Sequence, residues 1–429
     1  MTHILERTIA PEINPINRFH LPKVETVSFS NGIKLHQFAL GSQPVVRIEW
    51  IFESGGRAEI KNGVSFFTTK MLSEGTDAYT SPEIQKYLAQ FGAFLEVHPG
   101  NDRINITLYS LSKHLGTLIP FIKNLLTESV FPERELEKIK QIQEQAIQVN
   151  LEKTAYLAGI AYRELLFGKT HPYGKNLDGV SVKNISRNDL IIFFKEQLLN
   201  KACDIIITGG FDKEAIGMLE THFGKNILST STIKNKYESN QNAETVREKV
   251  IEKNGSVQSS VRYGRLLFNH THPDYFDAYI LNEILGGYFG SRLMQNIREE
   301  KGYTYGIHSS IVSLQEGGYF AIGTDVKREF TKNTIQEIEK ELQLLIDEPV
   351  SANELDTVKS FMLGSFIGDI QTPFSIADKF KTIYFNGLGY DYYDRFFNRI
   401  QNITQTELQE VAARYFSPKE MSYVIAGSL

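Results

Sequence analysis

Two distant segments of this chain share one design, and a long-period repeat of this kind leaves few folds open. CDIIITGGFD, residues 203–212, and MSYVIAGSL, residues 421–429, are both apolar runs that lead into glycine. Each run follows a helical pattern and a short polar turn, so each is expected to be a strand that closes a domain. The order of expected elements before these two runs also recurs. The repeat predicts an α+β fold of two homologous domains, each a mainly antiparallel β-sheet packed with helices.

The domain limits follow from a polar, almost aromatic-free stretch near the middle of the chain, which reads as a linker. We expect an N-terminal domain at 1–224, a linker at 225–256 and a C-terminal domain at 257–429. The expected strands and helices of the first domain are a strand at 45–52, a helix from Ser81, strands near Phe94 and Ile104, long helices to Phe167, a helix from Ser186 and a strand at 204–208. Those of the second are a strand at 259–267, a helix at 275–284, strands to Asp325 and helices at 333–346 and 351–367.

The segment GVSFFTTKMLSEGT, residues 63–76, predicts a half-buried helix with a glycine stop. It also resembles the inverted zinc-binding helix of the insulinase/pitrilysin metallopeptidase family, whose frame is G-x-x-H-F-x-E-H-M followed by G-T. The residues that fit this frame are Gly63, Phe67, Met71, Gly75 and Thr76.

The departures from the frame fall on the positions that carry its chemistry. In the family two histidines bind zinc and a glutamate is the general base. This chain has Phe66, Lys70 and Thr69 at those positions. Phenylalanine has no lone pair, lysine places a cation where the metal would sit, and threonine cannot take a proton near neutral pH. We therefore expect no metal and no other cofactor in this chain.

The family's third ligand is the second member of a Glu-x6-Glu pair on a later helix, which matches Glu137 and Glu144 in ELEKIKQIQEQ. Their spacing of nearly two helical turns places both on one face. One carboxylate does not replace three ligands, so both are interpreted as solvated charges. With the metal absent, an ion pair between Lys70 and Glu144 is a further hypothesis.

A second motif, LGGYFGSRLMQNIREEKGYTYGIHSSI, spans residues 285–311. It predicts a Gly-rich turn, a helix capped by Ser291 and stopped by Gly302, and a strand with Tyr305 on its buried face. The motif resembles the family's second-domain signature, in which an arginine and a tyrosine seven positions apart reach the substrate. The matching residues are Arg298 and Tyr305, and the resemblance gives them the roles of backbone binding and oxyanion support.

No other constellation of residues predicts an active site. His270, His272 and Asp274 adjoin a helix start and a proline, which is typical of a polar turn. Cys203 lies in an expected strand and reads as a small core residue. The net charge of −5 disfavours nucleic acid and anionic membrane surfaces as partners. The N-terminus lacks the pattern of a secretory signal and no segment resembles a membrane span, so a cytoplasmic location is expected.

The resemblance also implies a partner. Members of this family often divide their labour between two chains, one with the zinc and its base and one degenerate there. We therefore expect a chain that is inactive alone and forms a heterodimer with a homologous, zinc-bearing peptidase subunit, where Arg298 and Tyr305 act on unfolded peptides. Two alternatives stay open. One is a structural subunit like the respiratory-chain core proteins, and the other is a peptide-binding protein that self-associates as a homodimer.

Overall fold

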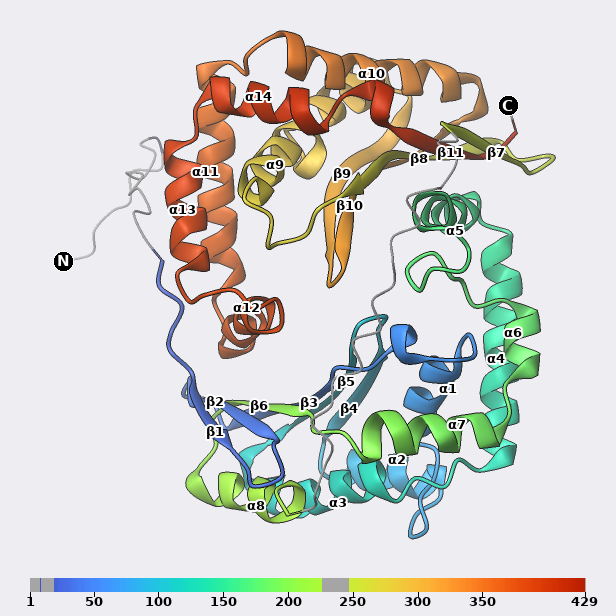
Figure 1. The fold of residues 1–429 in the computed structure, drawn as a ribbon, viewed down its shortest axis with the longest axis vertical. Coiled ribbons are helices and arrows are strands. Elements are labelled where there is room, and N and C mark those ends of the chain that lie inside the picture. The colour runs from blue at the N-terminus through green and yellow to red at the C-terminus, as the bar shows by residue number, and fades with distance from the viewer. Residues whose placement is uncertain (1–7, 9–18, 226–246, 429) are drawn as a thin grey trace.

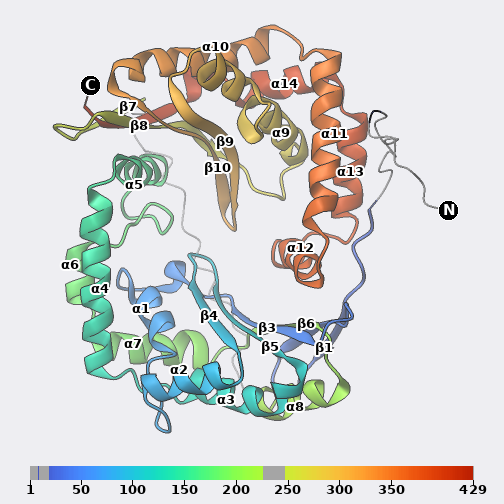
Figure 2. The ribbon, with the colours of Figure 1, turned by 180° about the vertical axis from the view of Figure 1, so that it is seen from behind.

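The computed structural model describes Thr8, residues 19–225 and residues 247–428 of the chain. It contains two α+β halves, each a sheet packed with helices, as the sequence predicts (Figure 1). The first sheet lies at the bottom of this view and the second at the top, with most helices on their outer sides. Seen from behind, α4 and α5 close one side of the molecule and α11 to α13 close the other (Figure 2).

The first half begins with three strands and ends with a strand and a helix. Its elements in chain order are β1 (Glu25–Ser28), β2 (Lys34–Phe38), β3 (Val45–Phe52), η1 (Gly56–Ala58), α1 (Val64–Met71), α2 (Ser81–Gln90), β4 (Phe94–Pro99), β5 (Ile104–Leu111), η2 (Ser112–His114), α3 (Leu115–Thr127), α4 (Glu133–Leu151), α5 (Thr154–Phe167), α6 (Gly179–Asn184), α7 (Arg187–Phe194), η3 (Lys195–Leu199), β6 (Asp204–Gly209) and α8 (Lys213–Phe223).

The second half ends on β11, an interior strand of its sheet. Its elements are β7 (Glu248–Glu252), β8 (Gln258–Leu267), α9 (Tyr275–Asn282), η4 (Glu283–Gly287), η5 (Met294–Glu300), β9 (Thr304–Leu314), β10 (Gly317–Lys327), η6 (Arg328–Phe330), α10 (Thr331–Asp347), α11 (Ala352–Asp369), α12 (Pro373–Phe385), α13 (Tyr392–Asn402), α14 (Gln405–Tyr415), η7 (Pro418–Glu420) and β11 (Ser422–Gly427).

The strand orders of the two sheets confirm the predicted repeat. The first sheet has the order β1-β2-β6-β3-β5-β4 and the second has β7-β11-β8-β10-β9. Without β1, each strand of the first sheet has a counterpart in the second at the same place in chain order and in space. In each sheet the strand that comes first in the chain, β2 or β7, pairs in parallel with the strand that comes last, β6 or β11. The other pairs among these strands are antiparallel. The closing strands β6 and β11, which the sequence identifies, are therefore equivalent.

The linker prediction falls largely outside the described residues, because residues 226–246 are not among them. The rest of the expected linker contains β7, which pairs in parallel with β11. The sequence interpretation missed this strand because β7 is short, three of its five residues are charged (EKVIE), and it lies at the edge of the sheet. Among the helices of the described residues, none is long and apolar enough to cross a membrane.

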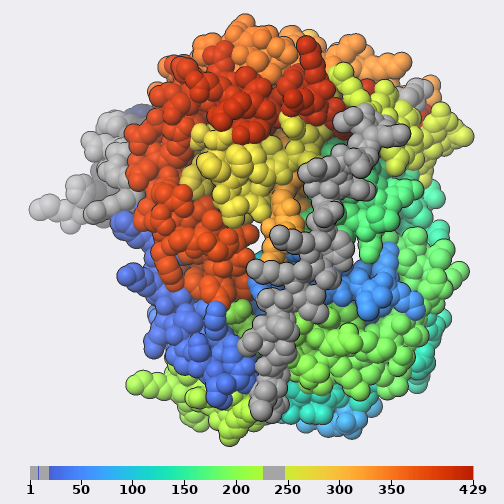
Figure 3. Space-filling model, viewed as in Figure 1, coloured from blue at the N-terminus to red at the C-terminus, as the bar shows by residue number. Residues whose placement is uncertain are grey.

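Each half also lends a helix to the sheet of the other half. Helix α5 of the first half packs on β8 and β11, where Ala158, Ala161 and Tyr162 are buried against Val424 and Ala426. Helix α12 of the second half packs in the corresponding way on the first sheet, against β6. In the space-filling view the helices of the second half lie directly against the strands near the N-terminus (Figure 3). The exchange joins the two cores.

A hydrogen bond and a glycine allow α5 to pack closely on the second sheet. The hydroxyl of Tyr162 donates to the carbonyl oxygen of Phe320 at 2.7 Å. A Cβ atom on Gly264 would lie 2.1 Å from that oxygen and 2.5 Å from the hydroxyl, and the residue has φ +153°. Both the space and the backbone conformation at this position require glycine.

The contact of α12 with the first sheet is charged as well as aromatic. Arg47 and Glu49 on β3 are buried, and they form ion pairs with each other and with Asp378 and Lys381 on α12 at 2.6 to 2.9 Å. Asp378 and Lys381 also pair with each other at 2.7 Å. The network balances two positive and two negative charges where the halves meet.

Candidate functional site

Helix α1 keeps the framework of the predicted helix. Gly63 precedes it with φ +92°, and a Cβ there would lie 2.5 Å from the side chain of Leu177. Phe67 and Met71 are fully buried in the first core. After the helix, Thr76 accepts hydrogen bonds from two backbone N–H groups of the following turn. These residues explain why the helix forms and where it stops.

The three positions that would carry the metal chemistry are used for packing and backbone contacts. Phe66 packs edge-to-face on Phe67, with ring centroids 5.2 Å apart. The hydroxyl of buried Thr69 donates to the carbonyl of Ser65 at 2.8 Å. The amine of Lys70 lies 3.4 Å from the carbonyl oxygen of Val97. This donor set does not fit zinc, since it offers no imidazole, thiolate or carboxylate.

The two glutamates of α4 do not complete a site. Glu137 pairs with Lys140 at 2.8 Å and is half exposed. Glu144 lines a shallow depression together with Lys183 of α6, and no ion pair joins it to Lys70. The hypothesis of a Lys70–Glu144 pair is therefore wrong for this structure. Within residues 19–225 and 247–428, no three His, Cys, Asp or Glu side chains are grouped so that they could hold a metal ion.

The second motif forms two π-helical segments, η4 and η5, joined by the Gly-rich turn. Leu293 and Ile297 are fully buried, which fixes η5 against the second core, and Gly302 ends it with φ +65°, as predicted. The prediction of Ser291 as the cap is wrong, because its hydroxyl is buried and has no hydrogen-bond partner among the described residues.

Tyr305 differs from the sequence prediction of a half-buried strand residue, because its side chain is 94% exposed. The cause is an irregular register between β9 and β10, where Ile307 pairs with Thr324 but Thr304 pairs with Val326. Such a bulge interrupts the alternation and turns a side chain outward. Tyr305 therefore points away from the core, and its hydroxyl has no hydrogen-bond partner within the described part of the chain.

Arg298 lies near the end of η5 with its guanidinium over the ring of Phe289, 4.6 Å from the centroid. Its nearest carboxylate is that of Glu299, at the limiting distance of 4.0 Å. Phe289 is itself 63% exposed. The guanidinium is thus oriented by a cation–π contact, and its N–H groups form no hydrogen bond within residues 19–225 and 247–428. Sequence reasoning missed Phe289, and its signal is a large apolar residue inside a Gly-rich turn.

The remaining candidates have separate partners. The ring of His270 contacts the hydroxyl of Tyr392 at 3.1 Å, and His272 stacks on Phe268. Asp274 accepts hydrogen bonds from Arg414 and Tyr415. These three side chains belong to a polar turn, as predicted. Cys203 is buried, and burial raises the pKa of its thiol, which fits a core residue.

Two family profiles match the chain. "Insulinase (Peptidase family M16)" matches residues 40–170, and "Peptidase M16 inactive domain" matches residues 184–362. The chain is 25% identical over 397 residues to a "Non-peptidase homolog YmxG" of Helicobacter pylori, covering 90% of this chain and 89% of that one. It is 21% identical over 218 residues to the "Mitochondrial-processing peptidase subunit beta" of Rattus norvegicus, covering 49% and 44%. A crystal structure of a peptidase M16 inactive domain from Pseudomonas fluorescens has the same fold, with a TM-score of 0.85, 23% identity and coverage of 95% and 99%.

Proposed function

This chain belongs to the M16 (insulinase) peptidase family, and from that premise we propose that it is the non-zinc subunit of a two-chain zinc peptidase. In this proposal a homologous partner supplies the zinc and the general base. This chain supplies Arg298 and Tyr305, which contact an unfolded peptide in the partner's active site. The similarity to a non-peptidase homolog and to a subunit of mitochondrial processing peptidase supports this division of labour.

The observation that carries the proposal is the state of the Arg298 and Tyr305 side chains. Among the described residues, the 94% exposed Tyr305 has no hydrogen-bond partner for its hydroxyl, and the Arg298 guanidinium contacts only the exposed Phe289 ring and, at 4.0 Å, Glu299. The Arg298 side chain is 34% exposed. Accessible aromatic and arginine side chains are typical of surfaces that bind a partner or ligand. At a peptide bond, the Tyr305 hydroxyl would donate to the developing oxyanion and Arg298 would bind a neighbouring carbonyl.

The chemistry of α1 explains why a partner is required. Thr69 cannot act as a base, and its hydroxyl is already bonded to the backbone. No step of peptide hydrolysis is therefore assigned to α1. Its role in this proposal is to support the surface around it.

The first experiment is an affinity purification of the full-length chain from extract of its source organism, followed by identification of stoichiometric partners. Recovery of a homologue with the H-x-x-E-H motif, and peptidase activity of the pair but not of this chain alone, would support the proposal. Recovery of only this chain or of non-peptidase proteins would contradict it.

The purified pair then tests the two residues separately. Tyr305→Phe removes one hydroxyl donor, so we expect kcat to fall by about a hundredfold, the effect of losing one oxyanion donor. Arg298→Ala is expected to lower kcat/KM with assembly intact. Arg328→Ala is the matched control, because Arg328 is an exposed arginine of the same half. Unchanged turnover in both Tyr305→Phe and Arg298→Ala would refute the assigned roles.

A further inference from the structure

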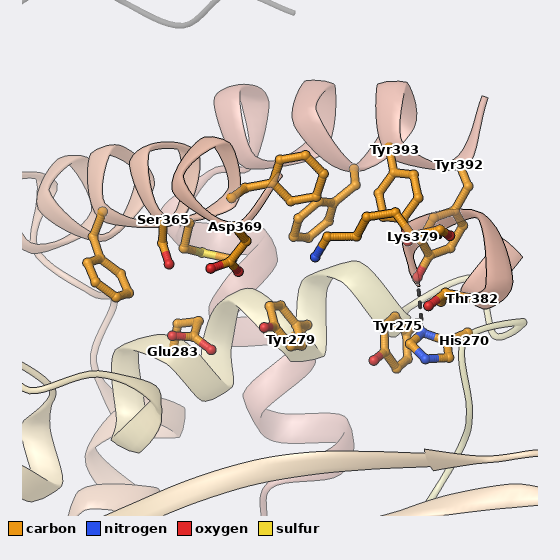
Figure 4. Close-up of a pocket in the computed structure, with 14 residues that line it drawn as sticks. His270, Tyr275, Tyr279, Glu283, Ser365, Asp369, Lys379, Thr382, Tyr392 and Tyr393 are labelled. Carbon is orange, nitrogen blue, oxygen red and sulfur yellow. Dashed lines mark hydrogen bonds between the residues drawn. The ribbon is translucent and has the colours of Figure 1, made fainter. Parts of the chain in front are cut away.

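A cavity of about 250 Å³ lies in the second half, between α9 and the helices α11 to α13 (Figure 4). It is lined mainly by aromatic side chains, among them Tyr275, Tyr279, Phe361, Phe366 and Phe396. The function proposed above uses none of these residues. The cavity shares His270 and Thr382 with a second depression, which lies where α12 meets the strands of the first sheet.

Three charged side chains face this aromatic cavity. Lys379 of α12 extends into it with its amine pointing toward Asp369 of α11, and Glu283 lies across from them at the end of α9 (Figure 4). The Lys379 amine contacts the Phe366 ring, 4.9 Å from the centroid. No ion pair within the described residues involves any of the three side chains, so their charged atoms are separated by more than 4.0 Å.

Glu283 is the least solvated of the three. Its carboxylate lies against the backbone of Gly287, where a Cβ atom would approach to 2.5 Å. Burial raises its pKa to about 7, with a smaller opposing effect from the Tyr279 hydroxyl. A buried carboxylate is ordinarily paired with a cation. Here the protein provides none at contact distance, although Lys379 faces the same space.

The arrangement favours a ligand that carries both charges. Glu283 is buried and Lys379 is half-buried, whereas Asp369 is exposed and its charge is solvated. A simple amine would compensate Glu283 but leave Lys379 without an anion, and a simple acid would compensate Lys379 but leave Glu283 without a cation. The volume lies below the range of about 300–1,000 Å³ that drug-sized ligands occupy, so the ligand is small. The aromatic walls suit an apolar side chain.

We propose that this cavity binds a free α-amino acid with a bulky apolar side chain. Glu283 and Asp369 receive its ammonium group, Lys379 receives its carboxylate, and the aromatic rings enclose its side chain. This site is independent of the peptidase proposal and requires no partner chain.

The test is titration calorimetry of the full-length chain with L-phenylalanine, N-acetyl-L-phenylalanine and L-phenylalaninamide. We expect L-phenylalanine to bind. Each analogue lacks one charge, so each should bind at least about tenfold more weakly, since a charged hydrogen bond is worth that much. No binding of L-phenylalanine at millimolar concentration would overturn the proposal. Equal affinity for phenylalaninamide would also overturn it, because the amine alone would then be recognised.

Lys379→Met tests the assignment of the carboxylate while keeping the length of the side chain. The variant should bind L-phenylalanine at least about tenfold more weakly and should no longer distinguish it from phenylalaninamide. A merely structural effect of the substitution would weaken both ligands alike and keep their difference. Lys332→Met, at an exposed lysine of α10, is the control and should bind as the parent does. Parent-like discrimination by Lys379→Met would refute the assignment.

Discussion

Replacing Arg47 by methionine should detach α12 from the first sheet. The substitution keeps most of the side-chain volume but removes one positive charge from a network with two of each sign. Glu49, Asp378 and Lys381 remain, so one negative charge is left without compensation. Since Arg47 and Glu49 are only 5% and 3% exposed, water cannot take the place of Arg47 beside Glu49. Removing one member of a buried pair costs about 3–5 kcal/mol.

We expect the lower end of that range, about 3 kcal/mol, because the side chain of Asp378 is half exposed and water can reach it. Denaturant unfolding gives the overall change in free energy. Hydrogen exchange resolved by segment shows where it acts, and α12 and β3 should lose protection while α10 keeps it. Segment resolution is needed because a chain of two halves can unfold in more than one step.

Two further variants make this reasoning refutable. Arg395→Met breaks an exposed pair with Asp391 and should cost no more than about 0.5 kcal/mol. The double variant Arg47→Met with Glu49→Leu restores the charge balance, because Asp378 and Lys381 on α12 still pair with each other. It should therefore recover most of the lost stability. If Arg47→Met costs no more than Arg395→Met, or if the double variant is less stable than Arg47→Met, the network does not hold α12 in this way.

Two other predictions concern single buried positions. Gly264→Ala should lower the free energy of unfolding by about 2–4 kcal/mol. The new methyl group would displace the Tyr162 hydroxyl from the Phe320 carbonyl, and the backbone has φ +153° at this position. A loss of less than about 1 kcal/mol in denaturant unfolding would contradict this. Glu283 has a pKa raised by burial to about 7, so its contribution to stability is full below the unfolded pKa and is lost as the pH rises through 7. The free energy of unfolding of Glu283→Gln should therefore equal that of the parent near pH 4.5 and exceed it by about 1–3 kcal/mol at pH 8, as measured by denaturant unfolding at the two pH values. The same difference between variant and parent at both pH values would contradict this cause.

The sequence contains enough information for the repeat and for most elements. Strand β3 coincides with the predicted strand at 45–52, and α2 begins at Ser81 as expected. Apolar periodicity and capping residues are local signals, so they are readable without the fold. The same local signals identified the closing strands β6 and β11, whose equivalence the sheet topology confirms.

The exchange of α5 and α12 could not be predicted in this way. The buried residues of α5, such as Ala158 and Tyr162, have helical spacing whichever sheet they cover. Likewise, Arg47 on β3 reads as a solvated charge until α12 of the other half is placed over it. Long-range pairing depends on which surfaces meet, and periodicity describes only one surface at a time.

The exposure of Tyr305 was missed for a related reason. Alternation along a strand assumes regular pairing, and the irregular register opposite Thr324 and Val326 breaks it. Nothing in the sequence between Thr304 and Ile307 marks this irregularity unambiguously, although Gly306 follows Tyr305 directly. The identity of the residue was therefore readable from the motif, but its direction was not.

The residues that stabilise the fold differ from those proposed to contact the substrate, and this difference determines how the function is tested. Phe67 and Met71 make α1 part of the core, so the helix persists without metal ligands. Tyr305 and Arg298, in contrast, belong to no core cluster of the described residues: Tyr305 is 94% exposed, and Arg298, whose side chain is 34% exposed, lies over the exposed ring of Phe289. Their replacement should leave the free energy of unfolding within about 0.5 kcal/mol of the parent value. A loss of turnover in Tyr305→Phe or Arg298→Ala at unchanged stability would then have to come from the substrate or the partner, since the fold itself does not depend on either side chain.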